Sequence, residues 1–281
     1  MSENNRELIQ KRIAEYEREG KFDLDVEDDP PSRTILPEEI DYLNKSLIQK
    51  IKTKAAFFLA YRFANRAIRR GELIIDDILG EENLRQEGGV ILTANHFSPM
   101  DSFIMHLAFD ASKRPGKLYR IIKEGNYTSF PGFYGFLMRN CNTLPLSSNR
   151  RTMKKLMDAT DTLLKRGECI LIYPEQSMWY NYKKPKPHKI GAYELAARSG
   201  ASVVPCFITM RETESIAPDG SPVMAHTVHF GKPILPDATL SRREAAEKMM
   251  RESFSYSREV YERVYGIPLK YETSSAPAGE L

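Results

Sequence analysis

Short apolar runs alternate with longer helical segments between residues 89 and 266 of this 281-residue chain. Parallel strands need crossover helices of this length, so the alternation favours a sheet that is mostly parallel and covered on both faces. The expected strands are 89–96, 117–123, 143–146, 168–174, 201–209 and 226–234; the expected helices are 98–112, 130–140, 148–167, 189–200 and 241–266. We predict an α/β fold: a single domain with a mixed, mostly parallel sheet flanked by helices and an N-terminal helical arm.

Local signals indicate where some of these elements begin and end. Ser98 is the expected N-cap of helix 98–112, with Pro99 at its first helical position. Gly167 is expected to end helix 148–167. Pro205 has no N–H to donate to a neighbouring strand, so it indicates an edge strand or the first residue of a strand.

Charge is unevenly distributed along the first quarter of the chain. Residues 1–41 carry 13 acidic and 6 basic side chains, whereas residues 42–71 carry eight bases and no acid. This contrast separates an acidic arm, 1–36, from a basic helical segment, 37–74. A domain over 75–270 follows, and the tail 271–281 is expected to be disordered.

The basic segment is the part of the sequence that bears on membranes. The longest apolar run, 55–60, is far shorter than the ~20 residues of a spanning helix, which excludes a transmembrane protein. A basic helix with apolar side chains suits the surface of an anionic membrane. Its apolar residues are Leu47, Ile51, Phe58, Tyr61 and Phe63. Alternatively, the helix packs on the core and its bases are solvated or paired with the acidic arm.

Cysteine usage and the N-terminus point to a compartment. The three cysteines, Cys141, Cys169 and Cys206, are too few and too scattered for a disulfide framework. The first residues are charged and contain no apolar signal segment. We therefore expect a cytoplasmic protein that associates peripherally with the cytoplasmic face of a membrane. Nucleic acid is not an expected partner, because no recognised nucleic-acid-binding motif follows the basic helix.

The segment 95–101, with the sequence NHFSPMD, lies where a buried strand leads into a helix. In open α/β sheets this end of the strands is where ligands bind. His96 is a candidate general base, and Asp101 could orient its ring and fix its tautomer. A purely structural alternative is that Asp101 supports the start of the helix together with Ser98.

Other polar residues carry weaker signals. Glu175 follows the buried strand 168–174 at the same edge of the sheet, although such a residue is often only a cap. His226 and His229 are three apart in a strand, so they face opposite sides and cannot bind one metal ion together. No metal site is predicted. The basic loop 183–189 could bind a phosphate or be solvated.

Taken together, these segments resemble the glycerolipid acyltransferases, which include the lysophosphatidic acid and glycerol-3-phosphate acyltransferases. The resemblance covers about residues 75–235 and rests on five matches in order along the chain. They are the NHxxxxD motif at Asn95, His96 and Asp101, the block 173–176, the helix start KIGAYELA at 189–196, the Val-Pro segment 203–208 and FGKPI at 230–234.

The resemblance implies transfer of a fatty acyl group from acyl-CoA or acyl-ACP to a lysophospholipid hydroxyl, most simply 1-acylglycerol-3-phosphate to phosphatidic acid. His96 would remove the hydroxyl proton, Asp101 would stabilise the imidazolium, and backbone N–H groups would hold the oxyanion. Asn95, Glu175 and Lys189 would bind substrate, with Glu175 positioning the glycerol. No metal, cofactor or covalent enzyme intermediate is required.

Departures from the family pattern concern the acceptor. Ser147 stands where the family's second motif usually ends in Arg, and Gln176 replaces a Gly. The bases that could substitute for the missing Arg are Arg150, Arg151 and Lys154. These departures leave room for a different lysolipid acceptor, or for a peripheral membrane-binding module that has lost activity. A hydrolase with Ser98 as its nucleophile is a third hypothesis, although no nucleophile elbow surrounds it.

Overall fold

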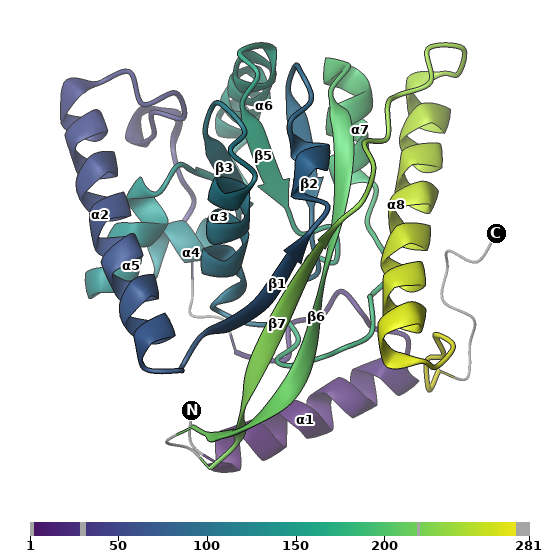
Figure 1. The fold of residues 1–281 in the computed structure, drawn as a ribbon. Coiled ribbons are helices and arrows are strands. Elements are labelled where there is room, and N and C mark those ends of the chain that lie inside the picture. The colour runs from purple at the N-terminus through teal and green to yellow at the C-terminus, as the bar shows by residue number, and fades with distance from the viewer. Residues whose placement is uncertain (1–2, 29–31, 218–219, 274–281) are drawn as a thin grey trace.

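The computed structural model describes residues 3–28, 32–217 and 220–273. Its centre is a seven-stranded sheet in the order β1-β7-β6-β2-β5-β3-β4 (Figure 1). The strands are β1 (Ile74–Leu79), β2 (Val90–Thr93), β3 (Leu118–Ile122), β4 (Thr143–Pro145), β5 (Cys169–Ile172), β6 (Ser202–Ile216) and β7 (Pro222–Phe230). All neighbours are parallel except β6 and β7. The predicted fold class is confirmed.

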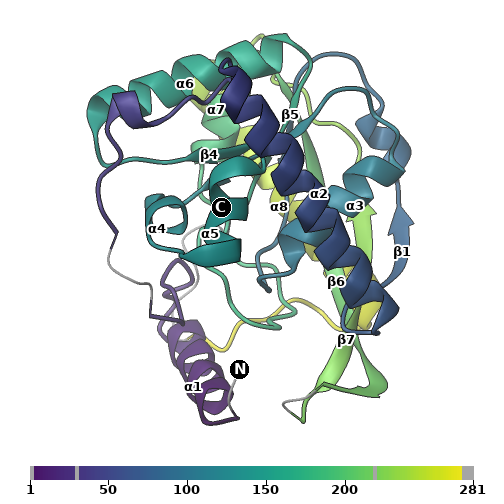
Figure 2. The same ribbon diagram turned by 90° about the vertical axis from the view of Figure 1, so that its left-hand side faces the viewer.

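Helices cover both faces of the sheet (Figures 1 and 2). They are α1 (Glu3–Arg18), α2 (Leu47–Arg69), α3 (Asp101–Ala111), α4 (Glu124–Thr128), α5 (Gly132–Asn140), α6 (Arg150–Lys165), α7 (Gly191–Ser199) and α8 (Arg242–Tyr265). Successive residues of β2 serve opposite faces: Leu92 packs in the core with α3, and Ile91 packs in the core with α6 and α7. This alternation is the period-two geometry of a strand that is buried on both sides.

Two sequence expectations about local boundaries are wrong. Helix α3 begins at Asp101 with Met100 as its N-cap, so Pro99 is outside the helix. Ser98 is not the N-cap, because its Oγ accepts the N–H of Met100 at 3.1 Å within the preceding turn. Residues 94–100 form the connection from the end of β2 to the start of α3.

Pro205 is the fourth residue of β6, an interior strand between β7 and β2, so neither expected position, an edge strand or the first residue of a strand, is correct. It forms the last parallel pair of β6 with β2, opposite Thr93, and the antiparallel ladder with β7 starts at Cys206. The carbonyl of Pro205 still accepts the N–H of Gly231 at 2.8 Å. The missing N–H is tolerated because it falls where β6 changes partners.

Two elements of the structure have no clear signal in the sequence. Strand β1 contains two exposed acids, Asp76 and Asp77, which break the apolar run and hide the strand signal. Helix α4 has only five residues, which is too short for a helical period to be visible. Residues 274–281, most of the tail expected to be disordered, lie outside the described residues.

The acidic arm docks on the loop after β5 and away from α2 (Figure 2). Its apolar side chains surround the fully buried Trp179, whose Nε1–H donates to the carbonyl of Leu24 at 2.9 Å. The Ser177 hydroxyl donates to the carbonyl of Phe22 at 2.7 Å. The alternative in which the arm neutralises the basic helix is therefore wrong.

Helix α2 packs against the domain through small buried residues, and several of its large apolar side chains are exposed. Its buried residues are Ala56, Ala64 and Ala67. None of the six bases in α2 forms an ion pair with a residue in the described part of the chain. Among the described residues, no helix is both long enough and apolar enough to cross a membrane.

Candidate active site

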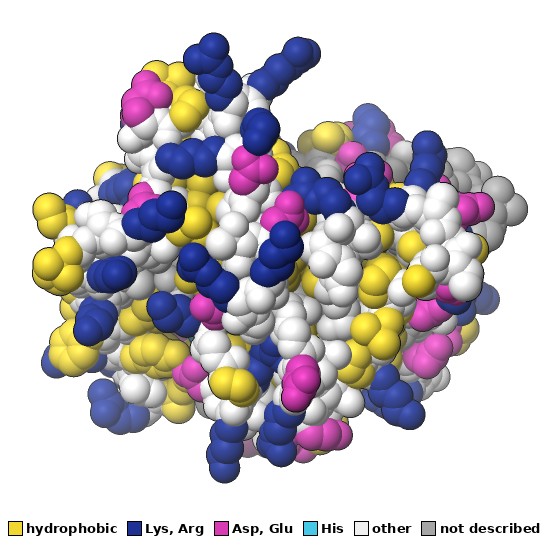
Figure 3. Space-filling view, turned by 90° about the horizontal axis from the view of Figure 1, so that it is seen from above, with side chains coloured by type: hydrophobic (Ala, Val, Ile, Leu, Met, Phe, Trp, Pro, Cys, Tyr) yellow, Lys and Arg dark blue, Asp and Glu magenta, His cyan; other side chains and the backbone are white. Residues whose placement is uncertain are grey.

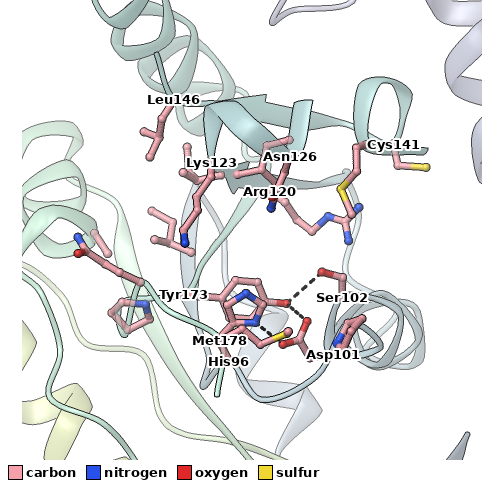
Figure 4. A pocket seen from close by; sticks show the side chains of 18 of the residues that line it. His96, Asp101, Ser102, Arg120, Lys123, Asn126, Cys141, Leu146, Tyr173 and Met178 are labelled. Carbon is pink, nitrogen blue, oxygen red and sulfur yellow. Dashed lines mark hydrogen bonds and ion pairs between the residues drawn. The ribbon is translucent and has the colours of Figure 1, made fainter. Parts of the chain in front are cut away.

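A cavity of about 1020 Å³ opens at the carboxyl ends of β2, β3 and β5. It reaches between α2, α3 and α5, where its wall is mostly apolar, and extends on the other side to α6, α7 and the arm. His96 and Asp101 are among the residues that line it (Figure 4). The sequence expectation that ligands would bind at this edge of the sheet agrees with the position of the cavity.

The structure brings His96 and Asp101 into direct contact. The ring Nδ1 lies 2.5 Å from Asp101 Oδ2, and the carboxylate is only 1% exposed. Tyr173 donates its hydroxyl to the other carboxylate oxygen at 3.0 Å and stacks on the imidazole at 4.3 Å between ring centroids. Both oxygens of Asp101 are thus engaged, and the ring plane of His96 is fixed from one side (Figure 4).

This arrangement leaves the second ring nitrogen of His96 for chemistry. Nε2 makes no hydrogen bond to any residue in the described ranges, and 23% of the His96 side chain is exposed at the cavity. Burial and the charge of Asp101 raise the pKa of Tyr173 well above its usual value, so its hydroxyl stays protonated and keeps donating. The geometry suits proton removal by a neutral imidazole.

Glu175 lies behind this pair and has no open side toward the cavity. It is 3% exposed; Oε2 accepts the N–H of His96 at 3.2 Å, and Oε1 accepts the N–H of Lys186 at 2.9 Å. The ammonium of Lys186 is 3.9 Å from Glu175 and donates to the carbonyl and hydroxyl of Ser177 at 2.6 and 2.7 Å. Burial raises the pKa of Glu175 and lowers that of Lys186 to about 8.

Comparison with known proteins identifies the domain that carries this geometry. A family model described as Acyltransferase matches residues 77–209. Residues 77–209 belong to the acyltransferase family. The match includes β2, the His96–Asp101 pair, Tyr173 and Glu175, and it ends within β6.

A solved structure is similar in fold to this chain over more residues than the family model matches. It is the 1-acyl-sn-glycerophosphate (LPA) acyltransferase PlsC from Thermotoga maritima, with a TM-score of 0.53 and 20% sequence identity. The alignment covers 82% of this chain and 87% of that one. At this identity the likeness concerns the fold. Comparison with curated protein sequences gave no significant match.

Within the acyltransferase domain, Asn95 holds the backbone and does not face the cavity. Its side-chain amide donates to the carbonyl of Ile208 at 3.0 Å, and its Oδ1 accepts the N–H of Ile208 at 2.8 Å. Asn95 and Glu175 were both expected to bind substrate. Their contacts instead fix the loop that carries His96, from β6 on one side and from the β5 loop on the other.

The three bases expected to replace the missing Arg lie away from the catalytic pair. Arg150, Arg151 and Lys154 are exposed on the first turn of α6 and do not line this cavity. Lys154 pairs with Asp158 at 2.7 Å, and with Arg151 it lines a different cavity. The hydroxyl of the buried Ser147 lies 2.9 Å from the carbonyl oxygen of Ile35 and 2.7 Å from the carboxylate of Glu124, so its one proton is shared between these acceptors. The chain then continues into α6, where the three bases are exposed.

The remaining sequence candidates have mixed outcomes. Lys189 lines the cavity, and its ammonium is 3.0 Å from Asp23 of the arm. Ser98 does not line the cavity and its hydroxyl is engaged in a turn, so the hydrolase hypothesis gains no support. Gln176 has φ +65°, a conformation that favours glycine, so the Gly expected at this position from the family pattern would fit here without strain.

Several cavity residues were missed by sequence reasoning. Tyr173 lies in the matched block 173–176, but its residue type alone indicates no role. Arg120 lies in the middle of β3, and Lys123 directly follows the strand. A charged residue inside the apolar run 117–123 was the signal that could have identified Arg120. Asp23 and Asp25 come from the arm, and no local pattern relates them to the domain.

The buried pair of Lys186 and Glu175 provides a stability test. We expect Lys186→Met to lower the free energy of unfolding by about 3 kcal/mol, because it leaves a buried carboxylate without its counter-charge. In the Glu175→Gln background the same substitution should cost less than half as much. Urea unfolding of the four variants of this double-mutant cycle measures the difference. Equal costs in the two backgrounds would show that the pair is not coupled.

Proposed function

We propose that this protein is an O-acyltransferase that moves a fatty acyl group from acyl-CoA or acyl-ACP to the hydroxyl of a lysophospholipid. The proposed acceptor is 1-acylglycerol-3-phosphate and the product phosphatidic acid. The observation that carries the proposal is the contact between His96 Nδ1 and Asp101 Oδ2, at 2.5 Å, inside a cavity with long apolar walls. The membership of residues 77–209 in the acyltransferase family supports it.

The proposed reaction is direct transfer. The acceptor hydroxyl donates a hydrogen bond to His96 Nε2, and its oxygen attacks the thioester carbonyl as the ring takes the proton. Asp101 stabilises the imidazolium formed in this step, and Tyr173 holds the carboxylate in place. When the tetrahedral intermediate collapses, the carbon–sulfur bond breaks and the imidazolium returns its proton to the departing thiolate.

The walls of the cavity support an acyl substrate. Between α2, α3 and α5 they are formed mainly by carbon atoms, which favour a hydrocarbon chain over water. The residues are Phe57, Ala60, Ala64, Phe103, Leu107 and Leu137. Glu175 and Asn95 are positioning residues in this scheme, since they hold the backbone on which His96 is carried.

The direct test is a thiol-release assay with acyl-CoA and a panel of lysolipids, with the products identified by mass spectrometry. The proposal expects thiol release that depends on the acceptor and yields a diacyl product. Thiol release without an acceptor would indicate a thioester hydrolase. No release with any acceptor or donor, including acyl-ACP, would contradict the proposal and favour the non-catalytic membrane-binding module.

The surface of α2 supports association with an anionic membrane. Exposed apolar side chains and exposed bases alternate on it, and Figure 3 shows them along the edge of the molecule where α2 lies. The exposed apolar residues of α2 are Leu47, Ile48, Ile51, Phe58, Leu59 and Ile68. Tyr61 and Phe63 are not free to insert, because Tyr61 bonds Asp110 and Phe63 packs on Phe103.

We expect the protein to sediment with anionic vesicles, to be released by high salt, and to bind neutral vesicles poorly. A base near an anionic surface contributes about 1 kcal/mol. If about half of the six bases in α2 face the lipid, the contribution is roughly 3 kcal/mol, or about 100-fold in partitioning. Replacing the bases with Gln should abolish sedimentation and spare activity on short, soluble acceptors. The five substituted residues are Lys50, Lys52, Lys54, Arg62 and Arg66.

A matched control carries five Gln substitutions at exposed bases on other elements. These bases are Lys113, Lys165, Arg242, Arg251 and Arg258. The control should sediment like the unchanged protein. It loses the same net charge as the α2 variant, but its bases in α2 are all retained. Equal binding to neutral and anionic vesicles would contradict the electrostatic account. Equal loss in both five-residue variants would show that net charge, and not α2, determines binding.

A further inference from the structure

Three basic side chains line the cavity, and two of them already have acidic partners. Lys123 pairs with Asp25, and Lys189 lies 3.0 Å from Asp23. Both acids belong to the arm segment that is fixed around Trp179 by buried hydrogen bonds. These two lysines are therefore neutralised by parts of the protein itself, and they offer little net attraction to an anionic ligand.

Arg120 is the third base, and its situation is different. It is 8% exposed, and its Nε has no hydrogen-bond partner in the described part of the protein. No ion pair to the guanidinium is formed by a described residue either, and the nearby Asp101 has both oxygens engaged by His96 and Tyr173. Figure 4 shows the Arg120 side chain extending into the cavity beside Ser102 and Cys141. A buried cation without a partner is costly unless a ligand supplies the counter-charge.

A second unpartnered group lines the same part of the cavity. His106 lies one turn after Ser102 on α3, and its Nε2 is buried without a hydrogen-bond partner in the described residues. Burial, with a smaller effect of the Arg120 charge, lowers the pKa of His106 well below its usual value. The neutral ring, which packs edge-on against Phe57, can donate one N–H.

We propose that Arg120, assisted by His106, binds the phosphate of the acceptor lysolipid, an inference that rests on the proposed function. The planar guanidinium offers paired donors that match a phosphate, and it is the unneutralised base of the described cavity wall. Ser102, beside it, bonds Tyr173 of the catalytic cluster. In 1-acylglycerol-3-phosphate the reacting hydroxyl and the phosphate are on adjacent carbons, so neighbouring sites are required. Arg120 thereby takes the role that the sequence suggested for Arg150, Arg151 and Lys154.

The test compares an anionic with a neutral acceptor. In the Arg120→Met variant, the ratio of kcat/KM for 1-acylglycerol-3-phosphate to that for 1-monoacylglycerol should fall by about 10- to 100-fold, through a higher KM for the phosphorylated acceptor. Arg120→Lys, which keeps the charge but loses the paired donors, should give an intermediate ratio. The matched control Lys123→Met should change the ratio by less than about threefold, because Lys123 is already paired with Asp25.

A second measurement does not depend on turnover. Glycerol 3-phosphate should raise the melting temperature of the unchanged protein and of Lys123→Met, but not that of Arg120→Met. An unchanged acceptor ratio in a folded Arg120→Met variant would overturn the proposal. A rise in the KM for acyl-CoA alone would also overturn it, because the phosphate bound at Arg120 would then be that of the donor. If the unchanged protein acylates neither acceptor, the proposed function itself has failed.

Discussion

Replacing His96 with Ala is expected to slow acyl transfer by about 100-fold or more, because a positioned general base typically contributes roughly 10²- to 10⁴-fold. The loss should appear in kcat at saturating acceptor, since Nε2 acts on the hydroxyl only as the reaction proceeds. His96→Ala also leaves Asp101, which is 1% exposed, without one of its two partners. A fall in activity caused by lower stability must therefore be distinguished from a fall caused by loss of the general base.

His96→Asn makes that separation. The side-chain amide of Asn can place an N–H near the position of the ring Nδ1 and keep a bond to Asp101, but it has nothing at the position of Nε2. This variant should melt close to the unchanged protein and be as slow as His96→Ala. Turnover within threefold of the unchanged protein in either folded variant would exclude His96 as the base.

Asp101→Asn is expected to reduce kcat by roughly 10²- to 10⁴-fold through the tautomer of His96. The Asn oxygen can still accept the Tyr173 hydroxyl, and its NH₂ group would then donate to His96 Nδ1. Nδ1 becomes the acceptor, so Nε2 carries the proton and cannot receive another from the substrate. Charge stabilisation of the imidazolium is lost at the same time.

The purely structural interpretation of Asp101 makes the opposite prediction. If Asp101 only supports the first turn of α3, Asp101→Asn should cost at most about 1 kcal/mol of stability and little activity. Measuring melting temperature and kcat on the same variant distinguishes the two. Asp110→Asn is the control, because it removes an acid from the last turn of the same helix. It should leave kcat near that of the unchanged protein.

The sheet and its flanking helices were predictable because their signals are local. Each strand that is buried on both faces is a short apolar run, and helices such as α6 and α7 carry a period and an end signal of their own. His96 and Asp101 were predictable for a similar reason. They lie five residues apart at one strand-to-helix connection, so a short motif contains both partners and their spacing.

The parts that were missed depend on contacts between distant segments. Nothing local distinguishes Glu175 as a buried group until Lys186 and the backbone of His96 are placed against it. Arg120 has a local signal, a charge inside an apolar run, but its role as the unpaired base of the cavity depends on distant contacts. The two lysines of the cavity are paired with residues 23 and 25, about 100 or more positions earlier. The same holds for Pro205, whose interior position depends on where β6 exchanges one neighbour for another.

The docking of the arm around Trp179 has a consequence for how the protein is made. Residues 3–28 leave the ribosome before Ser177 and Trp179, the residues that hold them, which are synthesised about 150 residues later. At 5–20 residues per second, the delay is roughly eight to thirty seconds. Ile9, Ile13 and Phe22 have no buried site during that time. The wall of the cavity that carries Asp23 and Asp25 is thus completed only after residues 177 and 179 are made, although residues 23 and 25 are translated well before them.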